Sequence, residues 1–359
     1  MSVSMLSENL VKAGIDTEVY ATTANGKLEL PVIPGATVNV DGVTVTYFKR
    51  LTKDHSHYSP ALFERLRKEV KSFDLVHIHA WWNLVSVFSC LIAIRQKVPV
   101  LLSPRGTLSP YSFQNKSIGV KWFLHQFLGA RLLRQCHIHT TSQPEADATA
   151  MLFRPKSMTI LPNFVKLPAK QVYPERALHG RIRLIFFGRI EEKKSLDTLL
   201  NALPHVEVPY QLTIAGDGNN AYIESLKKIT VDNGSAGHIN WIGFQTDNKF
   251  DLLQAQDLFI LPSHDENFGN AVIESLSVGT PVLISEGVGL VEYVKSNKLG
   301  WVCPADPLLF AQRINNIAAN GESELERIRK TAPGIIFNDF NEEVLAERYI
   351  NMYTQLIKA

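Results

Sequence analysis

The sequence contains few cysteines and no strong excess of charge of either sign. Its 359 residues include three cysteines, Cys90, Cys136 and Cys303, and no Cys-x-x-Cys pair. Such a scattered set offers no zinc site and no disulfide framework, and it is typical of a reducing compartment. The formal net charge of +2 lacks the concentrated basic excess of a dedicated nucleic-acid binder, so we expect no nucleic-acid partner.

Long apolar runs and metal-ligand clusters are missing as well. The longest apolar run, residues 84–94, is too short to span a bilayer, and no signal-peptide pattern opens the chain. We therefore expect a soluble, cytoplasmic protein. His77 and His79 share one face of a predicted strand, but no third ligand accompanies them, so no metal site is expected. His79 either forms hydrogen bonds in the lining of a cleft or is merely structural.

What the sequence does contain is a regular alternation of strand and helix patterns. Buried strands that end in polar or glycine-containing turns are predicted at residues 74–79, 99–103, 136–141, 183–187, 210–215, 238–243 and 258–261. Helical patterns separate them, which predicts doubly wound α/β domains whose ligands lie at the carboxyl ends of the strands. The length allows two such domains, and a loop-like connector with Pro168, Pro174 and Gly180 joins them near residue 165.

The first domain begins irregularly. Residues 2–13 predict an amphipathic helix before a strand at 17–21, whereas a doubly wound domain normally starts with a strand and a glycine-rich turn. We infer that the first strand and its loop are missing, with a natural domain that begins with a helix as the alternative. Residues 38–48 predict a hairpin around Asp41-Gly42.

A basic amphipathic helix is predicted at residues 116–134. Such a helix can lie on an anionic membrane surface. The alternative is an ordinary packing helix with a solvated basic face, and we favour this interpretation.

The stretch that carries most of the chemistry is residues 258–283. A buried strand leads into an exposed loop with Glu266, then into a glycine-bearing turn and a helix that contains Glu274. Free backbone N–H groups and the positive dipole end of that helix form an anion site. An acid beside an anion site suggests a ligand with phosphate on one side and sugar hydroxyls on the other. A second polyanion site is predicted at Gly188 and Arg189, which precede two lysines and a helix.

Several motifs occur in one order along the second half: Gly188-Arg189-Ile190 with Lys194, Ala215-Gly216-Asp217-Gly218, Trp241-Ile242-Gly243, Glu266 and Glu274 around Phe268-Gly269, and Gly279-Thr280-Pro281-Val282. In these residues the chain resembles the retaining glycosyltransferases of group 1 type with the GT-B fold. That large family includes bacterial polysaccharide and lipopolysaccharide sugar transferases. The resemblance covers residues 160–305 strongly and earlier segments more loosely.

This resemblance implies the α/β class and the GT-B architecture, two doubly wound Rossmann-like domains facing across a cleft. The implied domains are an acceptor-side domain at 1–165, a nucleotide-sugar-binding domain at 166–340, and a C-terminal helix at 341–359 that returns to the first domain.

The resemblance also implies roles for individual residues. Arg189 and Lys194 would hold the donor diphosphate, Glu274 would bind the ribose hydroxyls, and Glu266 would bind the donor sugar beside the reacting carbon. Glu266, Arg189 and Lys194 form the implied catalytic set. The implied donor site comprises Gly188, Arg189, Lys194, Gly216, Gly243, Phe268, Gly269, Asn270 and Glu274, and the acceptor side comprises His79, Asn83, Arg105 and Gly106. Because the chain has no Asp-x-Asp motif, protein groups rather than a metal would neutralise the leaving group.

The implied activity is that of a retaining, metal-independent hexosyltransferase. It would move a sugar from a UDP- or GDP-linked donor, with no cofactor, to a glycan or lipid-linked glycan acceptor in cell-surface polysaccharide biosynthesis. Such an enzyme would be cytoplasmic, with possible peripheral contact at the inner membrane surface. Two alternatives stay open: a nucleotide-sugar epimerase on the same fold, and a non-catalytic nucleotide- or glycan-binding protein if the shortened start is real.

Three features depart from the family pattern. Arg105 occupies a turn where many relatives carry a histidine, and Ser195 stands where glycine is usual after the lysine. The third departure is the missing glycine-rich loop, which in relatives faces the donor phosphate and the acceptor. Loss of a central strand predicts poor folding or low activity.

Overall fold

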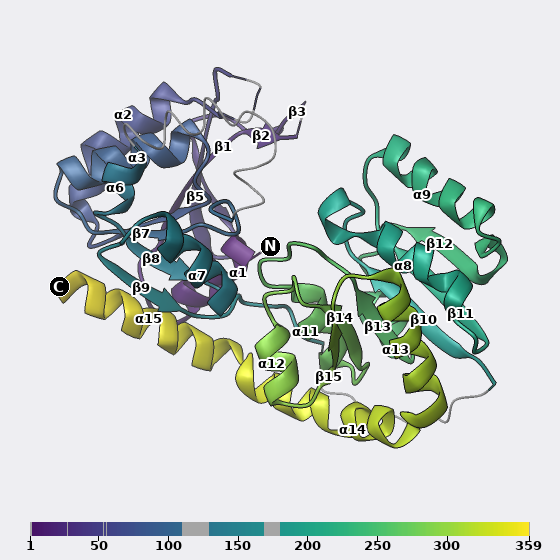
Figure 1. Cartoon of the computed structure of the whole chain (residues 1–359). Helices are drawn as coiled ribbons and strands as arrows, with labels where there is room; N and C mark the ends of the chain where they lie inside the picture. The colour runs from purple at the N-terminus through teal and green to yellow at the C-terminus, as the bar shows by residue number, and fades with distance from the viewer. Residues whose placement is uncertain are drawn as a thin grey trace. The chain divides into compact units, whose positions relative to one another are not determined.

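The computed structural model describes residues 2–26, 28–52, 54, 56–109, 129–168 and 180–358 (Figure 1). The chain splits into two compact units, one of Met1–Phe164 with Glu342–Ala359 and the other of Val165–Asn341. Parallel strands alternate with helices in both, which confirms the predicted α/β class. Most of the helix predicted at 116–134 lies outside the described residues.

The second unit contains a six-stranded sheet in the order β12-β11-β10-β13-β14-β15, and every neighbouring pair is parallel. Numbered along this unit the order is 3-2-1-4-5-6, that of a doubly wound dinucleotide-binding sheet. The order reverses between β10 and β13, and in such sheets ligands bind at the carboxyl ends of the strands beside this point. The strands are β10 (Ile182–Phe187), β11 (Tyr210–Ala215), β12 (Ile239–Gly243), β13 (Leu258–Leu261), β14 (Val282–Ser285) and β15 (Gly300–Cys303).

Strands β13 and β14 are buried at every residue, as expected for the middle of a parallel sheet that is covered on both faces. The continuous apolar run of β13 explains why the sequence predicted this strand at residues 258–261. The helices of this unit are η3 (Glu192–Lys194), α8 (Leu196–Ala202), η4 (Leu203–His205), α9 (Asn220–Asp232), η5 (Ala236–His238), α10 (Lys249–Gln254), α11 (Asn270–Ser277), α12 (Val291–Ser296), α13 (Pro307–Asn320) and α14 (Glu322–Asp339).

The first unit divides its strands among separate sheets, with the orders β1-β5-β4, β6-β7-β8-β9 and β2-β3. The predicted hairpin is confirmed, because β4 and β5 are antiparallel and Asp41 and Gly42 take positive φ values of 51° and 88°. The strands are β1 (Glu18–Thr22), β2 (Ala24–Asn25), β3 (Leu28–Glu29), β4 (Thr37–Val40), β5 (Val43–Phe48), β6 (Val76–His79), β7 (Val100–Ser103), β8 (His137–Thr140) and β9 (Ser157–Ile160).

The final helix of the chain belongs to the first unit. It contacts the N-terminal helix, and it buries Tyr349 and Tyr353. The helices of this unit are α1 (Ser2–Lys12), α2 (Pro60–Glu69), η1 (Val70–Ser72), α3 (Leu84–Arg95), α6 (Ala130–Leu133), α7 (Gln143–Leu152) and α15 (Glu342–Lys358).

Strands β1 and β6 each pair on one edge only. Among the described residues β1 pairs with β5, and β6 pairs with β7, so no backbone ladder joins the mixed sheet β1-β5-β4 to the parallel sheet β6-β7-β8-β9. The inferred loss of a first strand stays a prediction.

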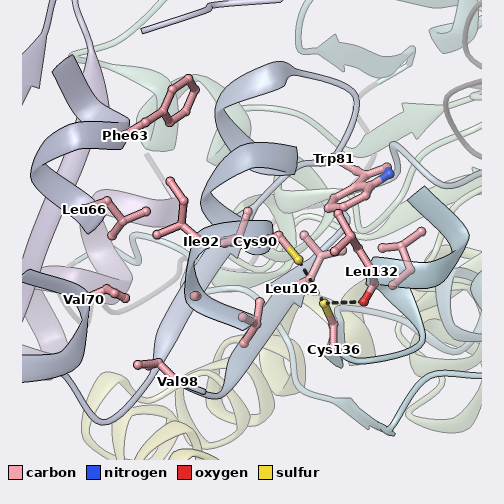
Figure 2. Close-up of a cluster of buried hydrophobic side chains, with 14 of the residues drawn as sticks. Phe63, Leu66, Val70, Trp81, Cys90, Ile92, Val98, Leu102, Leu132 and Cys136 are labelled. Carbon is pink, nitrogen blue, oxygen red and sulfur yellow. Dashed lines mark hydrogen bonds between the residues drawn. The ribbon is translucent and has the colours of Figure 1, made fainter. Parts of the chain in front are cut away.

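The core of the first unit is apolar and contains two cysteines (Figure 2). The sulfur atoms of Cys90 and Cys136 are 3.4 Å apart, and both thiols are free and buried. The hydrogen bond with Cys90 and the burial of the site raise the pKa of the Cys136 thiol. Since the thiolate is the reactive form, these cysteines act as inert core residues.

Candidate functional site

Glycine-containing turns lie together at the carboxyl ends of β10, β11 and β12. The amide of Gly188 donates to the carbonyl of Ala215 at 3.0 Å, and the amide of Gly216 donates to the carbonyl of Gly243 at 2.8 Å. A Cβ atom on Gly216 would lie 1.9 Å from the carbonyl oxygen of Gly188. Real Cβ atoms do not approach backbone oxygens this closely, so Gly216 lets the turns pack edge to edge. The structure therefore brings Gly188, Gly216 and Gly243 together.

Lys194 and Glu266 form an ion pair at the point where the strand order reverses. Lys194 ends η3 after β10, Glu266 follows β13, and the lysine Nζ donates to Glu266 Oε2. The two loops are also joined through the backbone, since the amide of His264 donates to the carbonyl of Lys193 at 2.9 Å. The Lys194 and Glu266 side chains are 13% and 15% exposed, so the pair is largely shielded from water yet open to a ligand.

The loop after β14 fixes the backbone of Glu266. The amide of Glu266 donates to Gly287 at 2.9 Å, and the amide of Gly289 donates to the carbonyl of Glu266 at 2.8 Å. A Cβ atom on Gly287 would lie 2.3 Å from the carbonyl oxygen of His264. Three loops, those after β10, β13 and β14, therefore hold the carboxylate of Glu266 in place.

Glu274 lies on α11 and forms a second buried ion pair. Its Oε1 accepts from Lys249 Nζ at 2.7 Å, and the two side chains are 10% and 13% exposed. Burial raises the pKa of the Glu274 carboxyl, and Lys249 opposes that rise. No sequence pattern pointed to Lys249, because a lone lysine at the start of α10 belongs to no motif and its partner lies 25 residues away.

The remaining predicted donor residues surround the start of α11 or lie in solvent. Gly269 precedes the helix with a φ of 94°, and Asn270 is its first residue. Phe268 is buried with its ring 6.2 Å from the ring of Phe340. Arg189 differs from the others, since its side chain is 74% exposed and pairs at 2.7 Å with Glu191.

Ser195 occupies a backbone conformation that favours glycine. Its φ of 48° and ψ of 43° lie in the left-handed region, directly before α8. The residue is fully buried, and its hydroxyl has no hydrogen-bond partner. The departure from glycine noted in the sequence therefore carries two costs, backbone strain and an unsatisfied polar group.

We expect Ser195→Gly to stabilise the second unit by about 1–2 kcal/mol, because it removes both costs and adds only the entropy of a glycine. Ser195→Ala separates the causes, since it removes the hydroxyl but keeps the left-handed strain, and it should give a smaller gain. Urea unfolding followed by hydrogen exchange of β10 and α8 measures the change. If Ser195→Gly is no more stable than Ser195→Ala, backbone strain does not destabilise the protein at this position.

A chain of hydrogen bonds joins histidines at the carboxyl edge of the first unit to α15. The hydroxyl of Tyr353 lies 2.8 Å from His77 Nδ1, and His77 Nε2 lies 2.7 Å from Ser103 Oγ. Ser103 Oγ is 2.6 Å from His139 Nδ1, and His139 Nε2 is 2.9 Å from the carbonyl of Leu161. Because a carbonyl only accepts, His139 Nε2 carries the proton, and the chain is complete with neutral imidazoles.

Burial controls the protonation of these rings. It lowers the pKa of His139 to about 3, with the charge of Arg105 adding to the effect. Burial likewise holds the pKa values of His77 and His79 well below the ordinary histidine range. His139 was not among the residues predicted from the sequence, although the His-Ile-His pattern at residues 77–79 recurs at 137–139 and could have identified it.

The predicted acceptor-side residues have defined structural contacts. Arg105 Nη1 donates to Asn163 Oδ1, and its Nη2 lies 3.4 Å from His79 Nδ1. The amide of Gly106 donates to Glu145 Oε1 at 2.7 Å. Asn83 is the N-cap of α3 and accepts from the Ser86 amide at 2.7 Å, so its side chain already has a structural role. Contact of Asn83 with an acceptor stays a prediction.

Within the described residues, no cluster of three or more histidine, cysteine, aspartate or glutamate side chains is arranged to hold a metal ion. None of the described helices combines the length and the apolar character needed to cross a bilayer.

Two family models match successive parts of the chain. Residues 1–167 match Glycosyltransferase Family 4, and residues 173–334 match Glycosyl transferases group 1. A lipopolysaccharide core biosynthesis glycosyltransferase, LpsE of Rhizobium meliloti, is 28% identical over 166 residues, 46% of this chain and 47% of the relative. An uncharacterized glycosyltransferase of Methanocaldococcus jannaschii, MJ1607, is 24% identical over 97% of this chain and 92% of its own.

Solved structures show the same fold. Anabaena Alr3699/HepE, crystallised with UDP and glucose, superposes with a TM-score of 0.74 at 16% identity and covers 99% of this chain and 96% of that one. The family models, which together span most of the chain, agree with this likeness and with the motifs of the second unit. The chain belongs to the group 1 glycosyltransferases of GT-B fold.

Proposed function

We propose that the chain transfers a sugar, with retention of anomeric configuration and without a metal, from a UDP- or GDP-linked donor to a glycan or lipid-linked glycan. The observation that carries this proposal is the pair of shielded lysine–carboxylate contacts, Lys194 with Glu266 and Lys249 with Glu274, beside the strand-order reversal. A cation for the phosphate and acids for the hydroxyls then lie at the usual ligand position of the sheet.

Each charged side chain keeps hydrogen-bonding capacity for a donor. A lysine ammonium has three N–H donors and a carboxylate has several acceptor positions, so neither is exhausted by one partner. Lys194 would donate to the diphosphate while Glu266 accepts from hydroxyls of the sugar, and Glu274 would accept from the ribose. Arg189, whose side chain is exposed, would turn from Glu191 to the phosphate.

In the proposed step the bond between the anomeric carbon and the β-phosphate oxygen breaks, and a bond to the acceptor oxygen forms on the same face. The proton of the acceptor hydroxyl passes to the departing diphosphate, and the products are a glycoside and a nucleoside diphosphate. The protein contributes positioning and stabilisation of the developing negative charge rather than a dedicated base.

The named relatives suggest where such a reaction belongs. LpsE acts in lipopolysaccharide core biosynthesis, and HepE was crystallised with UDP and glucose. We therefore place the activity in bacterial cell-surface polysaccharide or lipopolysaccharide biosynthesis, with UDP-linked donors as the first to test. The reaction would take place in the cytoplasm, at the inner face of the membrane.

The test is thermal stabilisation by UDP, GDP and a panel of their sugars. A ligand that binds the folded state at about 100 times its Kd stabilises by about 2.7 kcal/mol. We expect one nucleotide class to raise the Tm, Glu274→Gln and Arg189→Ala to abolish the rise, and the exposed Glu292→Gln to leave it intact. NMR of the product then reads the anomeric configuration. No shift with any nucleotide would contradict the proposal, and release of nucleoside diphosphate without any acceptor would indicate an epimerase.

A further inference from the structure

Arg105 places a largely buried positive charge where no carboxylate contacts it. Its guanidinium is paired with Asn163 and His79, which are both uncharged, and among the described residues it forms no ion pair. The Nε–H is buried and has no hydrogen-bond partner. Of the five N–H donors of an arginine, two are in use, so the cation is under-satisfied.

Glu145, a carboxylate whose charge acts on Arg105, already accepts hydrogen bonds from other groups. Glu145 Oε1 accepts from the Gly106 amide at 2.7 Å, and Oε2 accepts from the amide and hydroxyl of Thr141 at 2.8 and 3.1 Å. Glu145 therefore acts on Arg105 only through space, as do the phenols of Tyr349 and Tyr353. The histidines of the cluster stay neutral and supply no negative charge.

The backbone of Arg105 is strained as well. Its φ of 56° lies in the left-handed region, which a residue with a Cβ atom rarely adopts. A largely buried charge that has no ion-pair partner among the described residues, on a strained backbone, costs free energy. A bound anion offsets that cost, because it supplies the missing acceptor and the missing charge.

The position of Arg105 in the fold and the shape of its guanidinium indicate the class of anion. Arg105 follows β7, His79 is the last residue of β6 and Asn163 follows β9, so the group lies at the carboxyl edge of the sheet, where α/β sheets bind ligands. The planar guanidinium offers parallel N–H donors that match two oxygens of a phosphate.

We propose that Arg105 binds a phosphate group of the acceptor, so that the acceptor is a diphosphate-linked glycan rather than a neutral one. This assignment rests on the proposed transferase function. It gives the arginine that replaces the usual histidine a recognition role, in which it holds the phosphate while the acceptor hydroxyl reaches the donor sugar.

The experiment measures binding of inorganic pyrophosphate to the full chain by calorimetry, with saturating UDP present to fill the donor site. We expect Arg105→Gln to weaken pyrophosphate binding at least tenfold, with UDP affinity unchanged. Arg105→Lys should bind pyrophosphate more tightly than Arg105→Gln but more weakly than the parent chain. Arg95→Gln, which removes an exposed cation of the same unit, should bind pyrophosphate as the parent does.

Several results would overturn the assignment. They are the absence of pyrophosphate binding in the parent chain, equal binding by Arg105→Gln, and binding of sodium acetate as tight as that of pyrophosphate. If Arg105→Gln does not fold, hydrogen exchange of the parent decides instead, since pyrophosphate should protect the amides of residues 106–109. If the proposed donor site is wrong, the parent chain will not bind UDP but will still bind pyrophosphate through Arg105, so the two failures are distinguishable.

Discussion

Lys194→Met is expected to lower kcat for sugar transfer by about 10²–10³-fold, the usual effect of removing one preorganised group from developing charge. The methionine keeps the apolar stem of the side chain and loses only the ammonium that would face the leaving diphosphate. The change is measured as initial release of nucleoside diphosphate with saturating donor. Lys227→Met is the matched control, because Lys227 pairs with Glu224 on an exposed helix face and should keep full activity.

The same substitution also tests whether the pair is catalytic or structural. Lys194→Met leaves the Glu266 carboxylate shielded and unpaired, and breaking a buried pair in this way costs about 3–5 kcal/mol. Adding Glu266→Gln removes the stranded charge, so the double variant should regain most of the lost stability. We expect it to remain inactive. If activity returns together with stability, the pair serves the fold and the catalytic role is wrong.

The fold was predicted well because its strands are continuous apolar runs that end in polar turns. The strand predicted at 183–187 is observed at Ile182–Phe187, and the one predicted at 136–141 is observed at His137–Thr140. What periodicity cannot supply is how the strands are ordered. The separation of the first unit into unpaired sheets depends on which strand edges meet, and that information is not local.

The role of the predicted donor-side residues stays a prediction, but the residues themselves were predictable, because they occur in glycine-containing turns whose spacing resembles the family pattern. Their partners were not. Lys249 reaches Glu274 from another loop, and Tyr349 meets His139 across 210 residues of sequence. Such contacts arise only when distant elements pack, so a single sequence holds no signal for them. Arg105 lies between these cases: the sequence marked it as unusual, but only the structure shows that no carboxylate among the described residues contacts its guanidinium.

Acidification from pH 7 to pH 5 is expected to destabilise the first unit, by about 2 kcal/mol through His139 alone and further through His77 and His79. His77, His79 and His139 have folded pKa values below the ordinary value of 6.5, to about 3 for His139. The unfolded chain therefore binds more protons below pH 6.5. Stability is complete above that pH and falls progressively as the pH approaches the folded values.

Because a typical domain is stable by only about 5–15 kcal/mol, a loss of this kind should lower the protection of the first unit above the pH at which carboxylates titrate. Protonation would place positive charge beside Arg105 and break the chain of bonds that ties Ser103 to Tyr353 on α15. Hydrogen exchange with mass spectrometry separates the units, because peptides of β7 and β8 report on the first and those of β13 and β14 on the second.

The control for this prediction is His139→Asn, which removes one titrating ring from the network. The variant will be less stable at pH 7, but the slope of its unfolding free energy between pH 6.5 and pH 5 should fall by about 1 kcal/mol per pH unit, since one linked proton contributes at most about 1.4 kcal/mol per pH unit. An unchanged slope would show that His139 is not linked to folding. Protection of β7 and β8 that persists to pH 5 in the parent chain would contradict the linkage for all three rings.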